Sequence, residues 1–135
     1  MRVVLDTNIL LVCFSAKSSL HWIWQGLLEN RFTLCVTTDI LLEYEEVISR
    51  HINLVVASAV LDAITDLPNL QYVTKLVFWQ LIDQDPDDNK FVDCAIACNA
   101  KYLVSEDKHF KVLSSIPFPK VEVIGVEEFR QQLEE

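Results

Sequence analysis

Short apolar runs alternate along the chain with stretches in which apolar residues recur every three or four positions. The short runs predict strands at residues 2–5, 33–36, 70–73, 102–104 and 121–124. The periodic stretches predict helices at residues 9–14, 18–29, 38–50, 54–66, 88–99, 108–114 and 125–134. Strands this apolar are covered by helices on both faces, and such alternation is typical of a parallel sheet. We therefore predict an α/β fold with a central, mostly parallel sheet of about five strands flanked by helices. Residues 75–83 fit a strand and a helix equally well.

Polar side chains follow three of the predicted strands at the point where each strand ends. Asp6 comes directly after the first strand, the stretch TTD follows the second, and Ser105 to Asp107 follow the fourth. The carboxyl ends of parallel strands face a shared crevice, where ligands usually bind. Asp6 stands in the stretch VVLDTNIL, and a buried carboxylate needs a cation, a metal ion or several hydrogen bonds. Capping of the next helix is the alternative role for Asp6 and Asp107. For Asp6, its position at the carboxyl end of a strand favours a metal-binding or catalytic role. Of the neighbours Glu106 and Asp107, only one is expected to face the crevice.

Two predicted helices carry further acids, and the helical repeat of 3.6 residues indicates which way each one points. In the helix after the second strand, Glu43 and Glu45 flank the apolar stripe on opposite sides, so either one can reach the crevice. In the helix before the fourth strand, Asp88 is in phase with the apolar stripe and Asp93 points away from it. Phase therefore favours Asp88 as a crevice residue, although an acid at a helix N-terminus is also stabilised by the helix dipole.

Length and composition predict an ordinary globular protein with a single domain over residues 1–135. Apolar residues make up 51% of the chain and charged residues 23%. No apolar run is long enough to span a membrane, and the first residues reach Asp6 too early for a signal peptide. We therefore expect a cytoplasmic protein. Only two glycines are present, which excludes a glycine-rich phosphate loop. The four cysteines lack the spacing of a zinc site and are expected to be reduced core thiols.

The net charge of −9 argues at first against nucleic acid as a partner, because phosphate binders usually carry basic patches. The acids are not evenly spread, however, and crowd the stretch DQDPDD at residues 83–88. Divalent cations can neutralise carboxylates at such a local density. The charge is therefore ambiguous evidence. Asp85 and Asp87, on either side of Pro86, are expected to form a solvated turn.

Three segments together resemble the PIN-domain family, and more narrowly its VapC-like group, the toxins of bacterial and archaeal toxin–antitoxin pairs. The segments are VVLDTNIL, TTDILLEYEEV and DPDDNKFVDCAIACNAKYLVSEDKHF, and their order and spacing make the resemblance specific. It covers almost the whole chain. The resemblance implies a three-layer PIN-like fold and a metal-dependent endoribonuclease that cleaves the phosphodiester bonds of single-stranded RNA.

The resemblance also implies the residues of the site. The four acids of the family, which serve as metal ligands and catalytic residues, fall on Asp6, Glu43, Asp88 and Asp107. The implied cofactor is Mg²⁺ or Mn²⁺, which can activate water and stabilise charge on the phosphate. The third ligand can instead fall on Asp93, because the spacing from Asp88 to Asp107 is one residue longer than in the commonest toxins. Asn8 and Ser105 match supporting positions that would orient ligands or metal-bound water.

The implied partners are a single-stranded RNA substrate and an antitoxin protein, and a homodimer is also compatible with the sequence; no membrane partner is expected. Lys90, Lys108 and Lys111 are equally compatible with contacts to the RNA backbone and with simple solvation. The three histidines receive no role, although His109 stands close enough to Asp107 to contact a substrate. A partner surface could use the apolar residues Trp22, Trp24, Val77, Phe78 and Trp79, although core packing is the expected fate of most.

Three other classes of protein place acids at strand ends. A haloacid-dehalogenase-type phosphotransferase needs a second Asp two residues after the first, and this chain has Asn8 there. A receiver-like signalling domain needs an acidic pair after the first strand and a central phosphoacceptor Asp, and neither is evident. The remaining alternative is a catalytically silent PIN-fold module that only binds or regulates. Loss of a ligand would mark such a module, and here all four acidic positions are filled.

Overall fold

The computed structural model describes residues 1–134, and in this part of the chain five parallel strands form one sheet in the order β3-β2-β1-β4-β5. The strands are β1 (Arg2–Leu5), β2 (Thr33–Val36), β3 (Leu70–Tyr72), β4 (Tyr102–Val104) and β5 (Val123–Ile124). The strand order changes direction between β1 and β4. The carboxyl ends of strands at such a point are where open α/β sheets bind ligands, and this place is the crevice.

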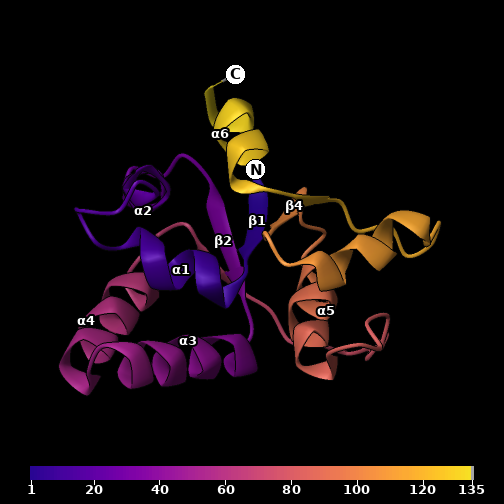
Figure 1. The fold of residues 1–135 in the computed structure, drawn as a ribbon, viewed down its shortest axis with the longest axis horizontal. Coiled ribbons are helices and arrows are strands. Elements are labelled where there is room, and N and C mark those ends of the chain that lie inside the picture. The colour runs from indigo at the N-terminus through magenta and orange to yellow at the C-terminus, as the bar shows by residue number, and fades with distance from the viewer. Residues whose placement is uncertain (135) are drawn as a thin grey trace.

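Helices cover both faces of the sheet. The α-helices are α1 (Thr7–Cys13), α2 (His21–Leu28), α3 (Thr38–His51), α4 (Leu54–Thr65), α5 (Asn89–Ala97) and α6 (Val126–Glu134), and the 3₁₀ helices are η1 (Pro86–Asp88) and η2 (Lys108–Ser115). Helices α1 to α4 lie on one side of β1 and β2, and α5 lies on the other (Figure 1). Helix α5 packs against β1, β2 and β4. The predicted three-layer α/β fold is therefore confirmed.

The strands are apolar because both of their faces are covered. Val3, Val4 and Leu5 of β1 are completely buried, as are the last three residues of β2. All four cysteines are free and buried, which confirms the prediction of reduced core thiols. Among residues 1–134, none of the helices combines the length and the hydropathy that crossing a membrane requires.

The structure departs from the predicted elements in three places. The last strand is shorter than expected and begins at Val123, and the helix expected at 108–114 is a 3₁₀ helix. Residues 75–83 form neither strand nor helix. Leu76, Val77 and Phe78 lie in solvent, with Leu76 88% exposed, whereas Ile82 is buried in the core. Burial of this segment therefore follows neither the alternation of a strand nor the stripe of a helix.

Glu106 faces away from the crevice and instead holds the start of α6. Its Oε1 accepts a hydrogen bond of 2.8 Å from the N–H of Val126. The carboxylate comes so close to Gly125 that a Cβ there would lie 2.9 Å from Oε1. A side chain at Gly125 would therefore displace the Glu106 carboxylate from its place at the start of α6. Of the two neighbouring acids, only Asp107 is left to face the crevice.

Candidate metal centre

Asp6 occupies the carboxyl end of β1, where its side chain is nearly buried. Its backbone N–H bonds to the carbonyl of Val104 on β4, 3.1 Å away, and Ser105 Oγ donates to Asp6 Oδ2 over 2.7 Å. Asp6 precedes α1, but its side chain makes no capping hydrogen bond to that helix. Burial raises the pKa of the Asp6 carboxyl, and the charges of Asp107 and Glu43 raise it further, against the lowering effect of Ser105.

Ser105 and Asp107 continue the site at the end of β4. Ser105 Oγ accepts a hydrogen bond of 3.0 Å from the N–H of Asp107, so this hydroxyl connects Asp107 to Asp6. Asp107 also caps η2 by accepting from the N–H of His109, at 2.9 Å. Asp107 therefore does cap the following helix. The same oxygen, Oδ1, also lies 3.4 Å from the imidazole Nδ1 of His109.

Asp88 approaches from the other side of the crevice, at the junction of η1 and α5. Its side chain does not cap α5, and the residue is only 8% exposed. Its Oδ2 lies 3.1 Å from His109 Nδ1. Burial raises the pKa of Asp88 to about 6. The hydrogen bond from His109 lowers this pKa, and repulsion from the charges of Asp85, Asp107 and Asp6 raises it.

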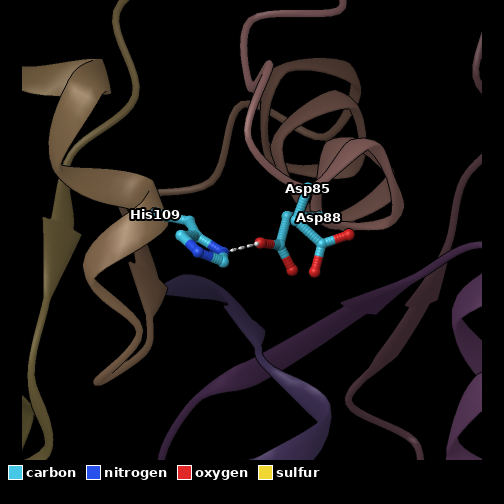
Figure 2. A group of neighbouring side chains, drawn as sticks. All are labelled: Asp85, Asp88 and His109. Carbon is cyan, nitrogen blue, oxygen red and sulfur yellow. Dashed lines mark hydrogen bonds and ion pairs between the residues drawn. The ribbon is translucent and has the colours of Figure 1, made fainter.

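Asp85 belongs to the same group of side chains, which corrects the expectation of a merely solvated turn. It does cap η1 by accepting from the N–H of Asp87, at 3.2 Å. However, a carboxylate oxygen of Asp85, one of Asp88 and a ring nitrogen of His109 all lie within 4.8 Å of one another. Figure 2 shows the two carboxylates and the imidazole facing one another across the gap between η1 and η2.

Glu43, and not Glu45, is the acid of α3 that faces the site. Its Oε2 accepts a hydrogen bond from Thr7 Oγ1, and its Oε1 lies 2.5 Å from Lys90 Nζ. Glu45 is exposed. Lys90, which sequence reasoning considered for RNA contact, has only 16% of its side chain exposed because it pairs with Glu43.

The sequence of residues 2–109 matches the family model described as PIN domain. The chain belongs to the PIN-domain family. Among solved structures, its fold is similar to the crystal structure of VapBC2 from Rickettsia felis bound to a DNA fragment from their promoter, with a TM-score of 0.63 and 21% sequence identity. That match covers 93% of this chain and 98% of the other. No curated protein matches the chain.

Asp93, the alternative third ligand, and Asn8, a suggested supporting residue, lie apart from the acids of this PIN domain. Asp93 is buried and accepts a hydrogen bond of 3.1 Å from the N–H of Trp79, so it anchors the loop at residues 75–83 to α5. Burial raises the pKa of Asp93, and the nearby charges are those of Lys75 and Asp39. Asn8 is exposed on α1. Of these residues, Asp88 is therefore the acid that the fold brings to Asp6 and Asp107.

The sequence did not predict three residues of the site as metal ligands or supporting residues: Thr7, Asp85 and His109. Each stands within two or three residues of a predicted acid, which is the only local signal available. Their directions depend on how α1, η1 and η2 pack around the crevice.

Comparison of two variants distinguishes Asp88 from Asp93. We expect millimolar Mn²⁺ to raise the melting temperature of the wild type and Asp88→Asn to remove this rise, because the variant deletes a charge next to three other site residues. Asp93→Asn should keep that rise, since its amide oxygen can still accept from Trp79 and its charge lies elsewhere. Thermal melts with and without Mn²⁺ provide the measurement. A loss of the Mn²⁺ effect in Asp93→Asn alone would reverse the assignment.

Proposed function

We propose that this PIN domain is a divalent-metal-dependent endoribonuclease that cleaves single-stranded RNA. The observation that supports the proposal is the convergence of Asp6, Glu43, Asp88 and Asp107 at the ends of β1 and β4. Asp6 and Asp88 are buried and repel their neighbours, and Lys90 compensates only Glu43. Packed carboxylates of this kind are stable as anions when a cation lies between them. The donor set, mainly carboxylate oxygens, fits Mg²⁺ or Mn²⁺.

In this proposal the ion is held by Asp6, Asp88 and Asp107, with Glu43 beside them. When bound, it would lower the pKa of a water molecule and stabilise negative charge on the phosphodiester. The chain itself positions the acids: Ser105 holds Asp6 by donating to Oδ2 and holds Asp107 by accepting from its N–H. Thr7 and Lys90 together orient Glu43. The Lys90 ammonium, paired with Glu43 at the edge of the acidic group, would also be available to a substrate phosphate.

We further infer that the protein acts as the toxin of a toxin–antitoxin pair. Its similarity in fold to VapBC2 supports this partnership. An apolar partner surface is available at residues 76–78, where Val77 is 51% and Phe78 is 64% exposed. Trp22 and Trp24 pack against the core, as expected for most of the aromatic residues considered. The same apolar segment is compatible with a homodimer.

The test of the proposed activity is cleavage of a labelled single-stranded RNA by the purified chain. We expect cleavage with millimolar Mn²⁺ or Mg²⁺, loss of cleavage in EDTA, and recovery when excess Mn²⁺ is added back. The same ions should raise the melting temperature, because an ion present at 100 times its dissociation constant stabilises the native state by about 2.7 kcal/mol.

A matched duplex of the same sequence serves as the control substrate and should be cleaved far more slowly. Cleavage that persists in EDTA would contradict the metal-dependent mechanism. If the chain does not cleave RNA and its melting temperature does not change with Mn²⁺, the result would favour the alternative, a catalytically silent PIN-fold binding module.

A further inference from the structure

An imidazole is part of the acidic group, although carboxylates alone would suffice for Mg²⁺. His109 lies in the first turn of η2, directly after the residues that end β4. Its Nδ1 lies 3.1 Å from Asp88 Oδ2 and 3.4 Å from Asp107 Oδ1, and the ring faces Asp85 as well (Figure 2). With 38% of its side chain exposed, the ring stands at the solvent side of the group.

The distances between these atoms match the spacing of ligands around one ion. In an octahedral site with bonds of about 2.1 Å, neighbouring ligand atoms are about 3.0 Å apart and opposite ones about 4.2 Å. The two separations from His109 Nδ1 to Asp88 and Asp107 are close to the first value. The donor atoms of Asp85, Asp88 and His109 all lie within 4.8 Å of one another, so none of these separations exceeds the second value by more than about 0.6 Å. The side chains therefore need little movement to share an ion.

Glu43 independently indicates on which side of the crevice the ion lies. Both of its carboxylate oxygens already have partners within the chain, Oε1 in Lys90 and Oε2 in Thr7. Asp88 has only the imidazole as its side-chain hydrogen-bond partner among the described residues. The carboxylates that most need a cation thus lie beside His109 and not beside α3.

We propose that His109 is a nitrogen ligand of the divalent ion and that, together with Asp85 and Asp88, it gives this PIN domain a preference for first-row transition ions such as Mn²⁺ over Mg²⁺. The chemical reason is that first-row transition ions accept an imidazole nitrogen more readily than Mg²⁺ does, with Mn²⁺ the weakest binder of that series, whereas Mg²⁺ favours oxygen ligands and retains its water. The inference rests on the proposed function in one respect only, that this pocket is the metal centre.

Mn²⁺ bound to the full chain can report the ligand directly. Electron spin echo modulation should show a coupled ¹⁴N nucleus in the wild type, which changes to the ¹⁵N pattern when histidine is labelled with ¹⁵N. His109→Asn should lose the coupling, because the amide can still bond to Asp88 but has no imidazole nitrogen. His51→Asn, on the exposed end of α3, is the matched control and should keep it.

Calorimetric titration gives the selectivity. We expect His109→Asn to weaken Mn²⁺ binding at least about tenfold and Mg²⁺ binding by much less, and Asp85→Asn to weaken Mn²⁺ binding roughly tenfold. Circular dichroism verifies that the variants are folded, and His109→Gln provides a second substitution.

The outcomes separate the inference from the proposed function. Mn²⁺ bound without nitrogen coupling, or equal losses for both ions in His109→Asn, overturns the role of His109 while RNA cleavage can stand. Nitrogen coupling without any RNA cleavage supports the ligand and overturns the nuclease. A wild type that binds no Mn²⁺ overturns both.

Discussion

Asp6→Asn should abolish RNA cleavage and at the same time raise the melting temperature of the metal-free protein at pH 7. Asp6 is only 6% exposed, and burial and the charges of Asp107 and Glu43 raise the pKa of its carboxyl. The amide removes the buried charge, and its oxygen can still accept the bond from Ser105. We expect cleavage to fall more than about a hundredfold, since a metal ligand is lost. The melting temperature should rise by roughly 2–8 °C.

The measurements are RNA cleavage with Mn²⁺ and thermal melts in EDTA. Ser105→Ala is the matched control for stability, because it keeps the charge of Asp6 and removes the hydrogen bond that stabilises it. This control should lower stability by about 1–3 kcal/mol, the usual result of leaving a buried acceptor unsatisfied. If Asp6→Asn proved less stable than the wild type in EDTA, Asp6 would be a structural carboxylate and not a site held for a cation.

The stability of the metal-free protein should fall as the pH rises from 4 to 8, and Asp88 should account for much of the change. Burial raises the pKa of Asp88 to about 6 in the folded protein, from an ordinary value of 3.8. The folded state therefore favours the protonated carboxyl. The stability that this provides is complete below pH 3.8 and is lost as the pH passes through about 6. The difference in pKa corresponds to at most about 3 kcal/mol.

Denaturant unfolding in EDTA at several pH values measures this effect. Other groups titrate in the same range, so the quantity to follow is the difference in unfolding free energy between Asp88→Asn and the wild type. It should increase in favour of the variant as the pH rises, whereas Asp62→Asn, an exposed site on α4, should show no such trend. Saturating Mn²⁺ should reverse the order at pH 8. A difference that stays constant from pH 4 to pH 8 would contradict the buried, repelled state of Asp88.

Together the two predictions describe a site that costs stability until an ion compensates it. Asp6 and Asp88 are buried, repel their neighbours and have raised pKa values. If stability alone mattered, these two positions would carry apolar or amide side chains in place of carboxylates. Functional sites commonly carry such local conflicts, which the rest of the fold offsets.

Local patterns were sufficient to predict the sheet, its helical layers and the end of the sheet at which the acids gather. An apolar run such as Val3 to Leu5 is a property of neighbouring residues, and the position of Asp6 follows once β1 is parallel to β4. Residues 75–83 could not be predicted in this way. Their conformation depends on Asp93 and Asn89, which bond to the backbone of Trp79 and Ile82 from α5.

The direction of each side chain toward the site was decided by packing. Glu43 and Glu45 are equivalent on the helix itself, but the Tyr44 hydroxyl donates to the carbonyl of Leu5 over 2.6 Å and sets the rotation of α3. That rotation brings Glu43 to Thr7 and leaves Glu45 in solvent.

The amino-acid sequence by itself determined the α/β architecture and the crevice with its acids, because hydrophobic periodicity and strand ends are encoded locally. Only the tertiary structure decided that Asp88 and not Asp93 lies within reach of the charges of Asp6 and Asp107, and that Asp85 and His109 gather beside Asp88. The physical reason is that η1 and η2 are short helices whose orientation comes from the elements against which they pack. Their side chains converge only when β4 and α5 lie beside β1.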